Sequence, residues 1–326
     1  MTSAAEGAEP ESLPVVTVVV ISKDEPALGD TLDALAEHVE TLAPGTVREV
    51  ELLVVDASSR RLDSIRVARP AVTWIDFERP EGVRISIPHQ RNRGVRAARG
   101  ETIVFIDCGC LPEPGWLGAV LAPILAGDEK MTCGQTGATG HLDPHRQGRS
   151  ALGSVRYLDE CPTINLAFRR SAFDEIGGFD ETFEYGSDVD FSWRAVHRGV
   201  RIRYVHDAVV LHDWGTRRRQ VKRSYAYGKA RARLYAKHVF GHGEQSIRKR
   251  RLNERDAVPV MYPLYLLGLP IVLKYRSYLL LLIVPLWKNR HERPFEGLLD
   301  HVGLAAGVLA GTAEIVRSRR AGDAGA

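Results

Sequence analysis

A run of apolar and β-branched residues near the start of the chain, Val15–Ile21 (VVTVVVI), is the feature that most constrains the fold. Neither face of a strand with this sequence is suited to water. Strands buried on both faces are typical of parallel sheets that are covered by helices on each side. The apolar residues that follow recur at helical spacing and predict an amphipathic helix: Leu28, Leu32, Leu35, Val39 and Leu42.

Further strands are expected at Glu51–Asp56, Ala71–Phe77 and Thr102–Asp107, and a helix over Pro88–Arg99 is expected to stop at Gly100. This alternation predicts a parallel, doubly wound α/β sheet. Such sheets bind ligands beyond the carboxyl ends of their strands. Polar clusters stand at three of these ends and predict one shared site: Ser22 to Glu25, Asp56 to Ser59 and Asp107 to Gly109.

The second half of the chain changes character at about Met131. Short strands are expected at 163–168, 201–205 and 208–211, and helices at 171–176 and 187–197. Beyond Trp214 the chain becomes basic, with thirteen Lys or Arg and one Glu in Arg217–Arg251, although the net charge of the whole chain is only +3. Such a block faces a diphosphate, a lipid headgroup or a nucleic acid, or it is a solvated helix face. We do not expect nucleic acid as a partner, because few aromatic residues are interleaved with the basic ones.

The segment Ala257–Trp287 is apolar and carries only two charges, Lys274 and Arg276. They divide it into runs shorter than the ~20 residues that span a bilayer. Three interpretations stay open: a segment lying on a membrane surface beside the basic helix, a homodimer interface, or a lid on the catalytic domain. The membrane interpretation would favour a polyprenyl-linked acceptor.

The start of the chain has no apolar core of the kind found in signal peptides, and residues 1–13 are expected to form a disordered tail. Four cysteines in a chain without an export signal indicate reduced thiols. These features predict a cytoplasmic location, peripheral on the inner face of the cell membrane if the 217–326 extension binds lipid.

Five stretches of the sequence, in this order, resemble the bacterial family 2 glycosyltransferases: VVTVVVISKDE, ELLVVDASS, PHQRNRGVRAARGETIVFIDCGCLPEPGWL, NLAFRRSAFDEIGGFDETFEYGSDVDFSWRAVHRGVRIRYV and VVLHDW. The third and fourth are long and specific. The resemblance implies an inverting GT-A catalytic domain over 14–216, with a Rossmann-like nucleotide-binding half and a mixed acceptor half, and a helical extension over 217–326.

The resemblance also implies a nucleoside diphosphate sugar as donor. Asp56 matches the aspartate that contacts the base, and Asp107 matches the first aspartate of the family's DxD motif. The other implied donor-binding residues are Ser22, Lys23, Asp24, Glu25, Arg91, Asn92, Arg93 and Gly109. These residue types suit the ligand independently, because carboxylates accept hydrogen bonds from ribose hydroxyls and the arginine fork binds phosphate.

The metal motif departs from the family pattern, because Asp107-Cys108-Gly109 lacks the second aspartate. Mg²⁺ and Mn²⁺ prefer oxygen ligands, so a nearby thiol is a poor substitute. Three interpretations stay open. A divalent cation binds through Asp107, the diphosphate, water and His212, which matches a metal-ligating histidine of some relatives. Alternatively, cationic side chains neutralise the leaving group, with Arg91, Arg93 or Arg217–Arg219 as candidates. In the third, the site is inactive.

On the acceptor side, the resemblance makes Asp188 the general base that takes the proton of the acceptor hydroxyl. Ser187 stands where the family has a glutamate. Asp190 lies two residues further along the helix and points elsewhere, so it is expected to cap, to pair with an arginine or to shape the acceptor pocket. The other acceptor-binding candidates are Glu184, Tyr185 and Trp193, and Trp193 is also typical of a core residue.

Two other nucleotide-binding classes are not favoured. A nucleotidyltransferase or a dinucleotide oxidoreductase would carry a glycine-rich loop after the first strand, where this chain has Ser22 to Glu25. The sequence therefore predicts an inverting hexosyl- or deoxyhexosyltransferase acting on a glycan, a lipid-linked or a small-molecule acceptor. The alternative is a non-catalytic sugar-nucleotide-binding or scaffold protein, because two motif carboxylates are replaced.

Overall fold

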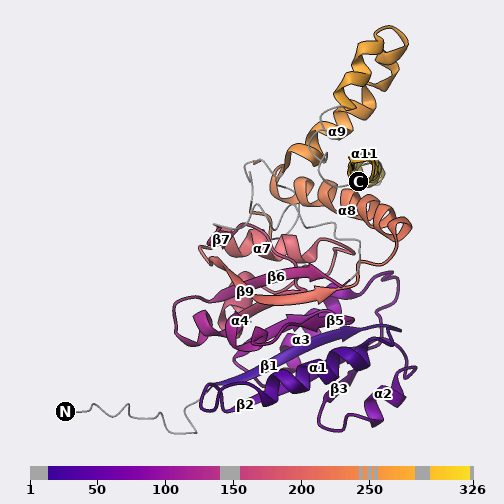
Figure 1. Cartoon of the computed structure of the whole chain (residues 1–326). Coiled ribbons are helices and arrows are strands. Elements are labelled where there is room, and N and C mark those ends of the chain that lie inside the picture. Colours follow the sequence, from indigo (N-terminus) through magenta and orange to yellow (C-terminus); the bar gives the residue numbers. More distant parts are fainter. Residues whose placement is uncertain are drawn as a thin grey trace, which may run out of the picture. The chain divides into compact units, whose positions relative to one another are not determined.

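The computed structural model describes residues 14–139, 155–241, 245–247, 252, 256–282 and 294–323. It divides into two compact units, Met1–Trp214 and Gly215–Ala326 (Figure 1). The predicted tail over 1–13 and the end of the apolar segment, 283–287, lie outside the described residues.

The first unit is built on one mixed sheet with the strand order β3-β2-β1-β4-β8-β6-β9-β5, and β7 pairs with β9. Strands β3, β2, β1 and β4 are parallel, whereas β8 runs antiparallel to β4 and β6. The strands are β1 (Val15–Ser22), β2 (Glu49–Asp56), β3 (Thr73–Asp76), β4 (Thr102–Ile106), β5 (Cys110–Pro112), β6 (Met131–Ala138), β7 (Tyr157–Leu158), β8 (Asn165–Arg169) and β9 (Ile202–His212). The predicted combination of a Rossmann-like parallel half and a mixed half is confirmed.

Helices cover both faces of this sheet. Because side chains alternate along β1, Val16, Val18 and Val20 pack against α1 and α4, whereas Val19 packs on the opposite face against α3. Helix α3 approaches β1 so closely that a Cβ on Gly94 would lie 2.6 Å from Val19 Cγ1. The helices of the unit are α1 (Leu28–Glu40), α2 (Asp63–Val67), α3 (Ile87–Ala97), α4 (Trp116–Leu125), α6 (Arg170–Ile176) and α7 (Ser187–His197).

One expectation for the second half is wrong in detail. The two strands expected at 201–205 and 208–211 are a single strand, β9, which pairs in parallel with β6. The register shifts between Gly134, opposite Val205, and Gln135, opposite Val209. The polar residues His206 and Asp207 fall in this irregularity, so they interrupt the apolar pattern without ending the strand.

The second unit contains α8 (Arg217–His238), α9 (Ala257–Leu267), the 3₁₀ segments η3 (Leu269–Leu273) and η4 (Arg276–Leu282), and α11 (Pro294–Asp323). Helices α8 and α11 pack through glycines, and a Cβ on Gly228 would lie 2.9 Å from the Cα of Gly307. Ion pairs join the same helices, Arg217 to Asp300 at 2.9 Å and Lys229 to Glu314 at 2.6 Å. The predicted helical extension is confirmed.

Among the described residues, one helical stretch, Gly297–Arg320 of α11, is long and apolar enough to cross a membrane, as core helices of soluble proteins also are. It lies beyond the apolar segment that the sequence singled out.

Candidate active site

The carboxyl ends of β1 and β2 bring two of the predicted polar clusters together. Ser22 pairs with Asp56 across β1 and β2. Asp56 is 5% exposed, and its Oδ1 accepts hydrogen bonds from the N–H of Ser58 at 3.2 Å and from Ser58 Oγ at 2.5 Å. Ser58 Oγ in turn accepts from the N–H of Asp24 at 2.7 Å. The loops after β1 and β2 are thus tied into one polar surface around Asp56.

The other predicted residues of the first loop are largely engaged locally. The Asp24 carboxylate pairs with Arg61 at 2.6 Å, and Glu25 Oε1 accepts from the N–H of Ala27 at 3.4 Å. Lys23 is exposed. In this loop, therefore, Lys23 offers an exposed positive charge, whereas the Asp24 carboxylate is already held in an ion pair.

Arg91 of α3 is a buried cation between the two halves of the unit. It is 7% exposed, and its guanidinium lies 5.6 Å from the centre of the Phe179 ring. Nη1 donates to Ser187 Oγ at 3.2 Å, and Nη2 lies 3.9 Å from Asp107 Oδ1. Arg91 therefore joins the end of β4 to the first turn of α7.

Asp188 occupies this first turn and is half-buried. Its Oδ1 accepts from the N–H of Val189 at 2.9 Å. Desolvation by the surrounding protein raises the pKa of Asp188 above its ordinary value, Arg91 partly offsets this, and the negative charge of Asp107 adds to it. Burial near a second carboxylate therefore makes Asp188 a stronger base than an ordinary surface aspartate, although the cation of Arg91 opposes this effect.

The motif Asp107-Cys108-Gly109 supplies one carboxylate. The Asp107 side chain is 39% exposed. Gly109 has a φ of 81° in the left-handed region, and its N–H donates to Thr31 Oγ1 at 3.0 Å. Burial raises the pKa of the Cys108 thiol to about 12 and that of Cys110 further, so both thiols are protonated at neutral pH.

His212 stands opposite Cys110 at the paired ends of β9 and β5. Its Nδ1 lies 3.5 Å from Cys110 Sγ, and its ring contacts Trp214 edge-on with the centroids 4.7 Å apart. No group of three or more His, Cys, Asp or Glu side chains suited to a metal occurs in the described part of the chain. This donor set fits a cation held by one protein carboxylate and by substrate phosphates, the usual arrangement for Mg²⁺, and does not fit an all-protein cage.

Two predicted acceptor residues are placed elsewhere. Asp190 is fully buried in an ion pair with Arg194 at 2.7 Å, which corrects the expectation that it contacts the acceptor and agrees with the alternative of pairing with an arginine. Trp193 is 3% exposed, and its Nε1 donates to Glu160 at 3.1 Å, so it is a core residue. Glu184 forms an ion pair with Arg84, and Tyr185 is half-buried.

Two predicted donor residues of α3 also lie away from Asp107. Asn92 is buried and holds the segment after α6, because its side chain exchanges hydrogen bonds with the N–H and C=O of Phe179. Arg93 is exposed, two residues from Arg91 and hence on another face of the helix. Of the distant candidates, Arg217 pairs with Asp300 inside the second unit.

Sequence reasoning missed Gln90, whose Nε2 donates to the C=O of Ser22 at 3.0 Å and of Val55 at 3.2 Å. This buried side chain fixes the strand ends that carry the site. It also missed Phe179, on which Arg91 rests. Gln90 belongs to the polar PHQRN stretch, but nothing in the sequence distinguishes its inward direction from that of its neighbours.

Comparison with known proteins gives the family. The model of "Glycosyl transferase family 2" matches residues 17–182, and that of "Glycosyl transferase family group 2" matches 157–301. The pre-mycofactocin glycosyltransferase of Mycobacterium tuberculosis is 30% identical over 165 residues, which are 45% of this chain and 34% of that protein. Polypeptide N-acetylgalactosaminyltransferase 12 of Mus musculus is 27% identical over 220 residues, 56% of this chain and 37% of that protein. The chain thus matches only about a third of the length of these curated relatives.

A solved structure with the same fold is the mannosyltransferase PcManGT from Pyrobaculum calidifontis, in complex with GDP-Man and Mn²⁺. The two structures superpose with a TM-score of 0.62 at 17% sequence identity, over 93% of this chain and 88% of the other.

Proposed function

The chain belongs to glycosyl transferase family 2, and from this premise we propose that it transfers a hexosyl or deoxyhexosyl group from a nucleoside diphosphate sugar to an acceptor hydroxyl, with inversion at the anomeric carbon. The observation that carries the proposal is the convergence of Arg91, Asp107 and Asp188 from three separate elements. A buried cation beside a raised-pKa carboxylate is what a displacement of a diphosphate by a hydroxyl requires.

In the proposed reaction Asp188 takes the proton of the acceptor hydroxyl as its oxygen attacks the anomeric carbon. The bond from that carbon to the diphosphate breaks on the opposite face, and the diphosphate leaves with the bonding electrons. The raised pKa of Asp188 supports this role, because a base whose pKa lies nearer to neutral pH accepts a proton more readily. Asp56 binds the nucleoside, and Glu184 and Tyr185 stand at the acceptor side.

Arg91 is the proposed partner of the leaving diphosphate. Ser187, a neutral residue, accepts a hydrogen bond from Arg91 where the family pattern has a glutamate. A glutamate there would neutralise Arg91, and an aspartate at 109 would add a second negative charge. Because both positions are neutral here, Arg91 faces two carboxylates fewer, and its positive charge is shared between Asp107, 3.9 Å away, and the phosphates.

We also propose a divalent cation at the leaving group, with a smaller contribution to charge neutralisation than in relatives that keep both motif carboxylates. Asp107 would hold it together with the diphosphate, and His212 is the second candidate ligand; when bound, the cation supplies further charge neutralisation at the leaving group. With one motif carboxylate in place of two, we expect activity to depend on Mn²⁺ or Mg²⁺ less steeply than where both are present.

A thermal-shift panel tests the donor assignment. UDP-, GDP- and dTDP-sugars are each added to the whole chain, with EDTA or with Mn²⁺, and at least one donor is expected to raise the Tm. Stabilisation by none of them would remove the basis of the proposal. The alternative of a non-catalytic sugar-nucleotide-binding or scaffold protein predicts donor binding without donor hydrolysis or transfer.

We further propose that the second unit attaches the enzyme to an anionic membrane surface, on the inner face of the cell membrane. Its segment 257–282, here called the apolar hairpin, contains no acidic residue and only two charges, Lys274 and Arg276. The hairpin is braced by stacking of Tyr265 on Tyr278, with centroids 5.1 Å apart, and by a hydrogen bond from Tyr278 to the C=O of Tyr265.

Exposure of this hairpin supports a lipid partner. Leu273 is 93% exposed and Leu267 is 64% exposed, as befits apolar side chains that enter the acyl boundary. Lys274 and Arg276 are exposed and follow Leu273 closely, as cations at a lipid headgroup do. Arg218, Arg219 and Lys222 of α8 are exposed as well. This location favours a lipid-linked acceptor over a free glycan or a small molecule. A homodimer formed through the same hairpin is the competing outcome.

A further inference from the structure

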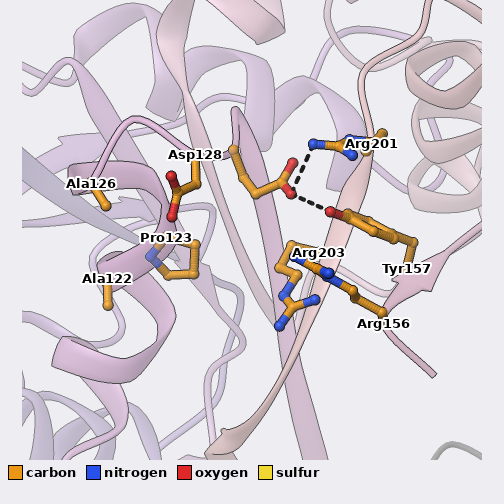
Figure 2. Close-up of a pocket in the computed structure, with 9 residues that line it drawn as sticks. Ala122, Pro123, Ala126, Asp128, Arg156, Tyr157, Arg201 and Arg203 are labelled. Carbon is orange, nitrogen blue, oxygen red and sulfur yellow. Dashed lines mark hydrogen bonds and ion pairs between the residues drawn. The ribbon is translucent and has the colours of Figure 1, made fainter. Parts of the chain in front are cut away.

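A cavity of about 660 Å³ lies in the first unit, lined by the end of α4 and the starts of β6, β7 and β9 (Figure 2). Its residue Arg201 directly precedes β9, whereas His212 stands at the far end of that strand. The strand has eleven residues, which at ~3.3 Å per residue corresponds to about 30 Å or more. Across the sheet, Met131 at the start of β6 pairs with Phe168, and Phe168 pairs with Ile103 at the start of β4. Asp107 follows the other end of β4 and lies 3.9 Å from Arg91, so the cavity is at the opposite edge of the sheet from that cluster.

Three arginines of this cavity surround one tyrosine ring. The guanidinium of Arg201 lies 4.7 Å from the centre of the Tyr157 ring, that of Arg156 lies 5.6 Å away, and that of Arg203 lies 5.7 Å away. The backbone produces this arrangement, because Tyr157 of β7 pairs with Arg203 of β9. Three like charges gathered around one ring repel one another unless anions compensate them.

One carboxylate compensates only part of this charge. Glu129 Oε1 accepts from Arg201 at 3.2 Å and from Tyr157 Oη at 2.6 Å. Dashed lines in Figure 2 mark these contacts at Arg201 and Tyr157. Within residues 14–139 and 155–241, no ion pair engages Arg156 or Arg203. Moreover, the Nη1 atom of Arg203 is buried and has no hydrogen-bond partner there. A buried charged donor without an acceptor is costly to the fold, and an incoming oxyanion would supply that acceptor.

We propose that this cavity is a binding site for a small ligand that carries an oxyanion, a phosphate or a carboxylate, on a sugar-sized body. Arg203 and Arg156 hold the oxyanion in their planar forks. The volume exceeds that of a bare phosphate and lies in the range of small-molecule pockets. On the wall opposite the arginines, Pro123 supplies an apolar surface and Asp128 an acceptor for ligand hydroxyls. The proposal does not depend on the transfer reaction.

Isothermal titration calorimetry on the whole chain tests this site, with inorganic phosphate, glucose 6-phosphate and glucuronate as separate probes. Comparing the affinities for the two phosphate probes with the affinity for glucuronate distinguishes a phosphate ligand from a carboxylate ligand. We expect binding of glucose 6-phosphate or glucuronate to weaken roughly tenfold or more in Arg203→Gln and in Arg156→Gln. The matched control is Arg198→Gln, which removes an exposed arginine outside the cavity, and it should bind as the unmodified chain does.

A second variant separates this site from the donor site. Arg91→Gln should leave the affinity for these probes unchanged; if it abolishes binding, the anion occupies the donor site and the proposal is wrong. The proposal is also wrong if none of the three probes gives a heat of binding. It is wrong as well if the Arg203 and Arg156 variants bind the probes with the same affinity as the unmodified chain. In anion-free buffer Arg203→Gln is expected to keep or raise the Tm while losing the ligand-induced rise, which a purely structural arginine would not do. Arg156 is exposed, so its variant tests the site even if Arg203→Gln misfolds.

Discussion

Arg91 donates a hydrogen bond to Ser187 at 3.2 Å across 96 residues of sequence. This contact joins α3, which belongs to the nucleotide-binding half, to the first turn of α7, which carries Asp188. Because the acceptor is a neutral hydroxyl, the contact orients the guanidinium without cancelling its charge. The same cation lowers the pKa of Asp188 from the higher value that burial alone would give. In the proposed reaction, base strength and leaving-group binding are therefore coupled through Arg91.

Replacing the proposed base is the most direct test of the mechanism. Asp188→Asn should reduce transfer by about 10²–10⁴-fold, the range for loss of a general base, because the amide cannot take the acceptor proton. Donor binding, followed as the thermal shift with the nucleotide sugar, should be retained. Turnover near that of the unmodified chain would move the base to another residue.

The pH dependence of kcat/KM should report the raised pKa of Asp188. The base must be deprotonated to act, so activity is lost as pH falls through its pKa, and this acid limb should lie above the ~3.9 of an ordinary aspartate. Arg91→Gln removes a cation that lowers this pKa and should move the limb to still higher pH. An acid limb at the same pH in Arg91→Gln would mean that Arg91 does not affect the pKa of Asp188. Arg93→Gln, which removes a nearby charge on another face of α3, is the control and should leave the limb in place.

Asp190 is expected to matter for stability and not for chemistry. Arg194 pairs with it, and both side chains are fully buried. Asp190→Ala leaves that guanidinium without its counter-ion and should cost about 3–5 kcal/mol of unfolding free energy, measured by urea denaturation. Asp174→Ala removes an exposed acid of α6 and should change stability by less than about 0.5 kcal/mol. Equal effects of the two variants would contradict this role.

The strand-and-helix frame of the first unit could be predicted because its core elements have clear periods. The run Val15–Ile21 is almost wholly buried, and α7 begins and ends where the sequence indicates. Helix α4 could not be predicted, because Gly115 and Pro123 disturb its pattern, and β5 has only three residues, too few for a pattern to show. The sequence splits β9 in two because His206 and Asp207 fall in a register shift that only pairing with β6 reveals.

Side-chain direction limits the prediction of the site residues. Arg91, Asn92 and Arg93 are consecutive and carry one predicted role, yet one contacts Asp107 and Ser187, one holds Phe179, and one is exposed. Helical geometry makes such neighbours diverge, but the sequence does not say which one faces the site. The cavity around Tyr157 could not be predicted at all, because only the pairing of β7 with β9 brings Arg156 close to Arg201 and Arg203.

The apolar hairpin predicts lipid binding that substitution can remove. Leu267→Asp with Leu273→Asp places two carboxylates on exposed positions and should abolish co-sedimentation with vesicles of phosphatidylcholine and phosphatidylglycerol, since charge is costly at the acyl boundary. Pure phosphatidylcholine should bind the unmodified chain more weakly. Val67→Asp, at a position 79% exposed in the first unit, is the control. A lipid-independent dimer that the double variant dissociates, with no vesicle binding, would assign the hairpin to self-association.

Restoring the missing motif carboxylate tests how the leaving group is handled. In Gly109→Asp the backbone must keep a φ of 81°, which aspartate tolerates better than most residues, and a Cβ at this position would meet only Ala27, at 3.7 Å. Gly109→Ala imposes similar backbone strain without a carboxylate and is the matched control. If Arg91 carries most of the neutralisation in the unmodified chain, the aspartate variant should show a larger ratio of activity with Mn²⁺ to activity with EDTA, and the alanine variant should not. An identical metal response in all three proteins would mean that position 109 takes no part in cation binding.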